Sequence, residues 1–189
     1  VSGTLYLDLN GHTITFKGSS NYAAIDIKSG STLYLYDSSN GSGAIKRDSS
    51  AGYKNGVYID HGTFVMNGGS ISGFTGADDG GCVRVYNYGS FTMNGGQIYD
   101  NAASNSGGGV GVSDNSSFKM TGGSIYSNNT RNTSQYVYGR AGVALCYGAS
   151  FEMTGGDIYS NNSVQFGGGV MHNSTGEFKM TGGRIDYNR

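Results

Sequence analysis

An eight-residue pattern, Phe-x-Met-x-Gly-Gly-x-Ile, recurs along the chain and strongly limits what the chain can fold into. Five clear copies begin at phenylalanines separated by 27, 27, 33 and 27 residues: Phe64, Phe91, Phe118, Phe151 and Phe178. Two degenerate copies precede them, Leu5 and Leu7 with Ile14, and Leu33 and Leu35 with Ile45. Self-similarity at a period of 20–50 residues is the signature of a solenoid or another repeat architecture.

Each period contains three short segments with the alternation of a β-strand, bounded by Gly, Asn or Ser. One lies at 83–85, 110–112 and 143–145, the second is Phe-x-Met, and the third is centred on the isoleucine. Three strands in 27 residues are too few for a propeller blade, but they form one coil of a solenoid. The sequence therefore predicts an all-β fold: a right-handed, single-stranded parallel β-helix of about seven coils, with three short strands per coil.

Stacking of the coils places equivalent residues above one another as ladders. We expect apolar ladders inside, formed by the five phenylalanines, by the methionines that follow them and by the isoleucines that end each pattern. The methionines are Met66, Met93, Met120, Met153 and Met180, and the isoleucines are Ile71, Ile98, Ile125, Ile158 and Ile185. An asparagine three residues after the isoleucine is expected to form a hydrogen-bonded ladder at a bend: Asn101, Asn128, Asn161 and Asn188.

These motifs resemble the right-handed β-helix proteins of the pectin-lyase-like superfamily. The likeness is closer to Phe-x-Met-x-Gly-Gly-x-Ile repeat domains of secreted and surface, adhesin-like proteins of bacteria, and segment 7–14 (LDLNGHTI) is similar to the first coil of many such domains. The resemblance implies an extracellular or cell-surface location. It does not imply one activity, because the superfamily contains lyases, hydrolases, epimerases and non-catalytic stalks. We expect residues 1–189 to be a single β-helix domain, a piece of a longer protein.

A stripe of tyrosines is the first candidate binding surface. Tyr99, Tyr126 and Tyr159 follow the isoleucine in three consecutive coils, so their side chains are expected to point outward. Such a stripe could bind sugar rings or a partner protein. The alternative is that the rings only pack on one another and stabilise the coils.

An insertion of six residues provides the second candidate. It falls in Asn128–Arg140 and carries Arg131, Tyr136, Tyr138 and Arg140. A long turn on a regular solenoid is where recognition residues are often found. A tolerated insertion with no binding role is the competing interpretation.

The sequence offers little for catalysis. Enzymes on this fold use clustered carboxylates, but no position carries two acids in successive coils. Glu152 is expected between Lys119 and Lys179, and Asp157 beside Arg184, as surface ion pairs. Asp78 and Asp79 are adjacent in a turn and could bind a cation, although a solvated loop is the simpler interpretation.

The cysteines and histidines are equally uninformative. Cys82 and Cys146 fall two coils apart, too far for a disulfide. His172 occupies a position that is apolar in other coils and has no second ligand in register, so no metal site and no cofactor is predicted.

The formal net charge of −1 and the lack of a long apolar run do not indicate nucleic-acid binding or membrane insertion. We therefore expect a non-catalytic domain, acting as an adhesive stalk or as a module that binds glycans or a host or bacterial surface protein. The alternative is a carbohydrate-active enzyme, either a polysaccharide lyase or a glycoside hydrolase. Coil edges left open at the two ends would also permit end-to-end self-association.

Overall fold

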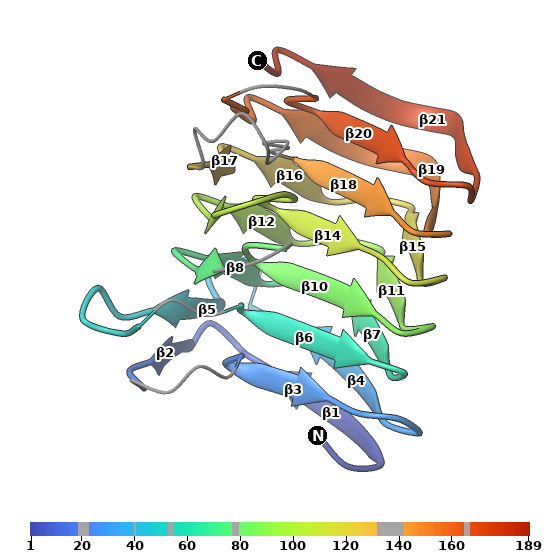
Figure 1. Cartoon of the computed structure of the whole chain (residues 1–189). Coiled ribbons are helices and arrows are strands. Elements are labelled where there is room, and N and C mark those ends of the chain that lie inside the picture. Colours follow the sequence, from blue (N-terminus) through green and yellow to red (C-terminus); the bar gives the residue numbers. More distant parts are fainter. Residues whose placement is uncertain (19–22, 40, 53–54, 77–79, 132–141, 165–166) are drawn as a thin grey trace.

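A computed structural model describes residues 1–18, 23–39, 41–52, 55–76, 80–131, 142–164 and 167–189. All regular structure within these ranges is β, and all strand pairs are parallel. The strands stack into a parallel β-solenoid whose coils rise from the N-terminal end to the C-terminal end (Figure 1).

Three long sides run along the solenoid, which we call sides A, B and C. Side A contains β1 (Thr4–Asp8), β4 (Thr32–Tyr36), β7 (Thr63–Met66), β11 (Ser90–Met93), β15 (Ser117–Met120) and the first halves of β19 (Ser150–Tyr159) and β21 (Phe178–Asp186). Side B contains β2 (Thr13–Phe16), β5 (Ala44–Arg47), β8 (Ser70–Ser72), β12 (Gln97–Tyr99), β16 (Ser124–Tyr126) and the second halves of β19 and β21. Side C contains β3 (Ile25–Ile27), β6 (Val57–Asp60), β10 (Val83–Tyr86), β14 (Val110–Val112), β18 (Val143–Cys146) and β20 (Val170–Asn173).

The coil count agrees with the sequence pattern. Sides A and B have seven levels and side C has six, so about six turns are complete. A short fourth side, which the sequence did not predict, pairs β9 (Thr75–Gly76), β13 (Ala102–Ala103) and β17 (Asn129–Thr130).

The predicted apolar ladders form the core. Phe64 pairs in register with Phe91, and the same column continues through Phe118 and Phe151 to Phe178. Their rings stack at centroid separations of 4.6–5.2 Å with nearly parallel planes. The degenerate copies lie in the same column, because Leu5 pairs with Leu33 and Leu33 with Phe64.

The glycine pairs make the bend between sides A and B. The second glycine of each pair has a positive φ, for example +84° at Gly96. A Cβ there would lie 2.6 Å from both the Gly69 carbonyl oxygen and the Met66 Cε. Only glycine satisfies both the backbone conformation and the close approach of the neighbouring coil.

The asparagine ladder is confirmed. The Nδ2 of Asn101 donates to the Oδ1 of Asn128 at 3.0 Å, Asn128 donates to Asn161 at 2.9 Å, and Asn161 to Asn188 at 3.0 Å. Each Oδ1 also accepts the backbone N–H of the preceding asparagine of the ladder, as between Asn101 and Asn128 at 3.2 Å. The ladder therefore fixes the bend after side B in every coil from Asn101 onward.

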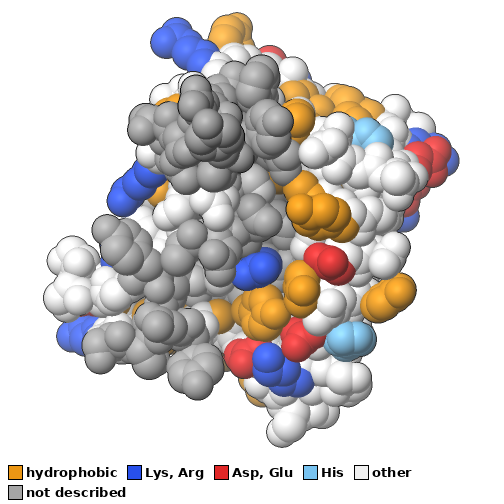
Figure 2. Space-filling view, in the orientation of Figure 1, with side chains coloured by type: hydrophobic (Ala, Val, Ile, Leu, Met, Phe, Trp, Pro, Cys, Tyr) orange, Lys and Arg blue, Asp and Glu red, His pale blue; other side chains and the backbone are white. Residues whose placement is uncertain are grey.

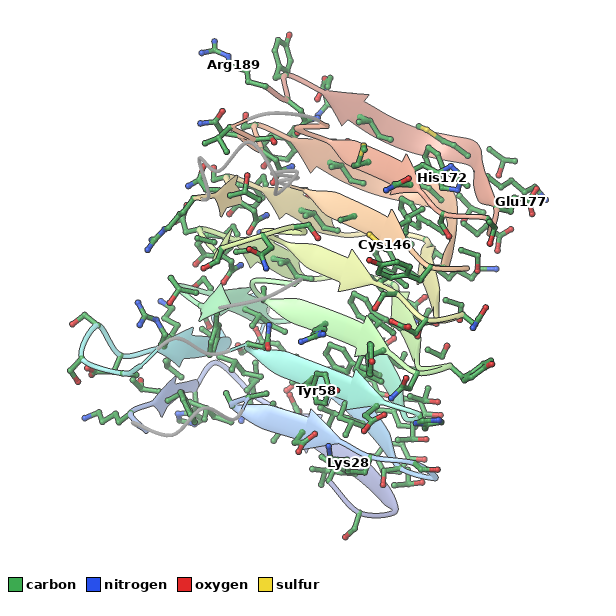
Figure 3. The ribbon with its side chains drawn as sticks, viewed as in Figure 1. Lys28, Tyr58, Cys146, His172, Glu177 and Arg189 are labelled. Carbon is green, nitrogen blue, oxygen red and sulfur yellow. The ribbon has the colours of Figure 1, made fainter. Side chains whose placement is uncertain are left out.

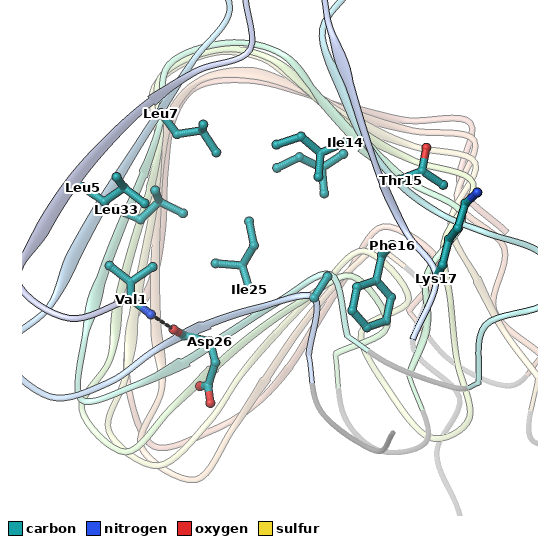
Figure 4. A pocket seen from close by; sticks show the side chains of 12 residues that line it. Val1, Leu5, Leu7, Ile14, Thr15, Phe16, Lys17, Ile25, Asp26 and Leu33 are labelled. Atoms are coloured by element: carbon teal, nitrogen blue, oxygen red, sulfur yellow. Dashed lines mark hydrogen bonds between the residues drawn. The ribbon is translucent and has the colours of Figure 1, made fainter. Parts of the chain in front are cut away.

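The N-terminal end of the core is open. Looking along the axis, Leu5, Leu7, Ile14 and Ile25 line an apolar hollow of about 390 Å³ (Figure 4). Leu5 is 43% exposed, whereas its counterpart Leu33 is fully buried, because no coil covers the first one among the described residues.

Candidate functional site

The tyrosine stripe lies where the sequence placed it, on the outer surface of side B. Tyr99, Tyr126 and Tyr159 pair in register, and their rings stack at 5.1 and 5.0 Å with planes within 6° of parallel. The Tyr126 hydroxyl donates to the Gln97 Oε1 at 3.2 Å. Burial, together with the two flanking tyrosines, raises the pKa of Tyr126.

This stacking limits which surfaces of the tyrosine rings a ligand can contact. A tyrosine binds a sugar ring through the face of its π system, and here each ring covers a face of the next. The middle ring, Tyr126, therefore presents mainly its edge and hydroxyl group to solvent, whereas Tyr99 and Tyr159 each keep one face that no tyrosine covers, next to Ser72 and Asp186. The self-packing role is directly visible, whereas a ligand-binding role for Tyr99, Tyr126 and Tyr159 remains a prediction.

The insertion is only partly described. Arg131 is exposed just after β17, where its backbone N–H donates to the Ala103 carbonyl oxygen at 3.0 Å. Tyr136, Tyr138 and Arg140 lie outside the described residues.

Two predicted ion pairs are confirmed on the surface. Lys119 Nζ lies 2.9 Å from Glu152 Oε2, and Arg184 Nε lies 3.0 Å from Asp157 Oδ1. The hydrogen bond and charge of Lys119 lower the pKa of Glu152. All four side chains are well exposed, so each pair contributes little to stability.

The two cysteines are not joined in a disulfide, and His172 is not part of a metal site in the described residues. Cys82 and Cys146 are both buried, and burial raises the pKa of the Cys82 thiol. His172 pairs with Leu145 as predicted, but it is exposed and its Nε2 lies 2.9 Å from the Gly176 carbonyl oxygen. Within the described part of the chain, no three His, Cys, Asp or Glu side chains gather as a metal site; Asp78 and Asp79 lie outside it.

Sequence reasoning missed a cluster on the outer surface of side C, which we call the side C cluster: Asp26, Lys28, Tyr58, Asp60, Arg84 and Tyr86. Charged and hydrophobic side chains gather over β3, β6 and β10 in the space-filling view (Figure 2). Lys28 and Tyr58 lie beside one another on this face (Figure 3). The Lys28 Nζ is 5.0 Å from the centre of the Tyr58 ring, 3.2 Å from Asp26 and 3.6 Å from Asp60.

Toward the C-terminal end of the side C cluster, a second cation also lies close to aromatic rings. The Arg84 guanidinium lies 5.7 Å from the Tyr58 ring centre and 5.1 Å from that of Tyr86, and the two rings lie 6.4 Å apart. Below them, Asp60 accepts a hydrogen bond from Asn87 Nδ2 at 3.0 Å and lies 2.8 Å from His61 Nδ1. Two aromatic rings, two cations and two carboxylates thus share one rigid sheet surface.

The signal for the side C cluster was present in the sequence. Segments 25–28, 57–60 and 83–86 alternate an apolar with a polar or aromatic residue, and the apolar members point inward. Alternation predicts which side chains point outward, but the alignment of these three segments depends on irregular early turns. Without that register, Lys28, Tyr58 and Arg84 could not be recognised as neighbours.

No family model matches the chain, and comparison with curated proteins and with solved structures finds no significant match. No helix in the described residues has the length and hydrophobicity needed to cross a membrane.

Proposed function

We propose that this chain is a non-catalytic binding domain of a secreted or surface protein of a bacterium, and that it displays side chains for glycan or protein recognition on a rigid solenoid. The side C cluster carries this proposal. Its aromatic rings and charged groups project from paired strands, so they lose little conformational freedom when a ligand binds. The likeness to adhesin-like repeat domains points in the same direction.

A carbohydrate-active enzyme is the second candidate, and one observation favours it. Asp26 and Asp60 both approach the ammonium of Lys28, at 3.2 and 3.6 Å, so two carboxylates from adjacent coils converge on one outer sheet. Glycoside hydrolases work with such a carboxylate pair.

The electrostatics of Asp60 argue against its acting as the general acid of such a pair. Burial alone would raise the pKa of Asp60, but hydrogen bonds from Asn87 and His61 and the charge of Lys28 lower it overall. A general acid needs a raised pKa in order to protonate the leaving group near neutral pH. Asp60 is thus ionised and held by a cation, which suits a ligand contact better than proton donation.

The test compares binding with turnover. The 189-residue chain is applied to a glycan microarray and, separately, incubated with pectic and host polysaccharides whose products are separated by chromatography. Binding without cleavage is the expected result. Cleavage that is lost in Asp60→Asn would establish the enzyme instead, and no glycan binding would leave only the protein-binding form of the proposal.

We also propose that copies of the chain associate end to end. Phe178, Met180 and Ile185 at one end occupy the same columns as Leu5, Leu7 and Ile14 at the other, and Met180 is 42% exposed. Sides A and B can therefore continue from one copy to the next, which leads to open filaments rather than closed dimers. Sedimentation at rising protein concentration should detect oligomers that Leu5→Lys abolishes, and a monomer at all concentrations would refute this.

A further inference from the structure

Three tyrosines adopt a backbone conformation that aromatic residues rarely take. Tyr88, Tyr147 and Tyr187 have φ values of +60°, +49° and +50°. The other described non-glycine residues with positive φ are asparagine, aspartate, histidine or serine. Asparagine, aspartate and histidine enter this region several times more readily than bulky side chains do.

Burial does not explain these tyrosines. Tyr88, Tyr147 and Tyr187 are 70%, 71% and 80% exposed, the highest values among the exposed large hydrophobic side chains. A strained backbone under an exposed aromatic ring gains little packing energy in return. Packing therefore does not explain the choice of tyrosine, and we consider a role in ligand binding for Tyr88 and Tyr147, which lie near one another along the solenoid.

Tyr88 and Tyr147 lie in equivalent turns between sides C and A, two coils apart, but at neighbouring positions of the turn, since Tyr88 aligns with Gly148 and Tyr147 with Asn87. In Figure 3, the labelled Cys146 marks the end of β18, and Tyr147 follows it. Strand spacing of about 4.8 Å places the two tyrosines about 10 Å apart along the axis. The coil between them contributes Asp114 and Asn115, which occupy the same turn.

Backbone hydrogen bonds connect these turns from one coil to the next. The Tyr88 N–H donates to the Asp114 carbonyl oxygen at 3.0 Å, and the Asn115 N–H donates to the Tyr147 carbonyl oxygen at 2.9 Å. Gly148 leaves room for the Asn115 side chain, because a Cβ at this position would collide with the Asn115 amide. The two tyrosines and the polar pair between them therefore keep a fixed spacing.

The rings differ from those of the stripe in having open surroundings. Tyr88 has the His61 ring at 6.1 Å, tilted by 36°, rather than a parallel tyrosine stacked on it. Its counterpart in the next coil is Asn115, and the counterpart of Tyr147 is Asp114. Neither ring has a tyrosine at the same position one coil away, so neither is covered by tyrosines on both faces as Tyr126 is.

We propose that Tyr88, Asp114, Asn115 and Tyr147 form a glycan-binding rim, on which an oligosaccharide lies along the solenoid axis. One sugar ring packs its C–H face on each tyrosine, since those hydrogens are attracted to the negative face of the π system. The Asp114 carboxylate and the Asn115 amide accept and donate hydrogen bonds to the hydroxyl groups in between. This rests on the proposed function and adds a glycan contact surface to the side C cluster that carries it.

A protein partner fits the rim less well. Protein interfaces need a continuous patch of roughly 800 Å² per partner with an apolar centre. Here the residues between and beside the two rings are small or polar, with the His61 ring next to Tyr88: Asn87, Gly89, Asp114, Asn115, Gly148 and Ala149. Exposed aromatic rings separated by polar groups match a polyhydroxylated ligand.

Tyr88→Asn and Tyr147→Asn separate binding from folding. Asparagine tolerates positive φ, so the single variants should melt at or above the wild-type temperature. The oligosaccharide that binds the wild-type domain most strongly on a glycan microarray serves as the probe in calorimetric titration. Each single variant should weaken its binding about fivefold, and the double variant more than tenfold.

Tyr187→Asn is the matched control, because Tyr187 has the same backbone conformation and exposure but lies in a different turn. It should bind the probe as the wild type does. Unchanged binding in the double variant would overturn the rim, while binding of the probe by the wild type would still support a glycan-binding function. A wild type that binds no glycan on the array would overturn both.

Discussion

Removal of one amide from the middle of the asparagine ladder should destabilise the domain out of proportion to its size. The Asn128 side chain is fully buried and takes part in four hydrogen bonds. Its Oδ1 accepts the backbone N–H and the Nδ2 of Asn101, and its Nδ2 donates to the Ile98 carbonyl oxygen and to Asn161. Asn128→Ala removes all four at once.

The magnitude follows from which groups are left without a partner. The Asn101 Nδ2 still donates to the carbonyl oxygens of Ile71 and Tyr99, at 3.2 and 2.8 Å. The Asn101 backbone N–H loses its acceptor in a site that water cannot reach, which costs about 1–3 kcal/mol. With the bond lost by Ile98 and the small cavity, Asn128→Ala should lower the free energy of unfolding by about 2–4 kcal/mol.

The assay is urea denaturation followed by both far-UV circular dichroism and tyrosine fluorescence, because a repeat domain can unfold coil by coil. Asn129→Ala is the control, since Asn129 is exposed and keeps its backbone hydrogen bond to Asn101 at 2.8 Å. It should change stability by less than about 0.5 kcal/mol. Equal effects of the two substitutions would refute the reasoning that the buried ladder stabilises the bend.

Three further outcomes are expected. Gly96→Ala should cost more than Gly30→Ala in thermal melts, because both have positive φ but only Gly96 meets a carbonyl oxygen at 2.6 Å, and equal costs would contradict the close-approach argument. The pKa of Asp37 is lowered from 3.8 to about 2, chiefly by the hydrogen bond from the Gly11 N–H. The stability that ionised Asp37 contributes is complete above pH 3.8 and is lost as the pH falls through about 2. Asp37→Asn should therefore flatten the stability–pH curve in that window. Lys119→Ala should change stability by at most about 1 kcal/mol at low salt and by less at high salt, and a larger, salt-independent loss would contradict a surface role for its ion pair with Glu152.

The coil and its interior could be predicted because they depend on spacing. A phenylalanine every 27 residues must stack on its copy if every coil closes in the same way, and the register of Phe64, Phe91 and Phe118 confirms it. The fourth short side could not be predicted in this way. Its strands, such as Thr75–Gly76, contain only two residues each, too few to carry a periodic pattern.

Which side chains are neighbours on the outer surface could be learned only from the three-dimensional structure. The stripe of Tyr99, Tyr126 and Tyr159 was predicted to face outward, but only the stacked geometry shows that both faces of the Tyr126 ring are covered. The approach of Lys28 to Tyr58 depends on the register of early coils whose turns differ in length. Sequence spacing does not fix which outward residues meet across such turns.

By itself, the sequence determined the solenoid, its apolar ladders and its asparagine bend, because a close-packed interior admits few alternatives at each repeated position. The tertiary structure decided how the exterior is arranged: which rings cover one another, which carboxylates share a cation, and which tyrosines are exposed at positive φ in turns. The physical reason is that solvent accepts almost any side chain on the surface, so the pattern of burial leaves the neighbours of an exposed residue unspecified.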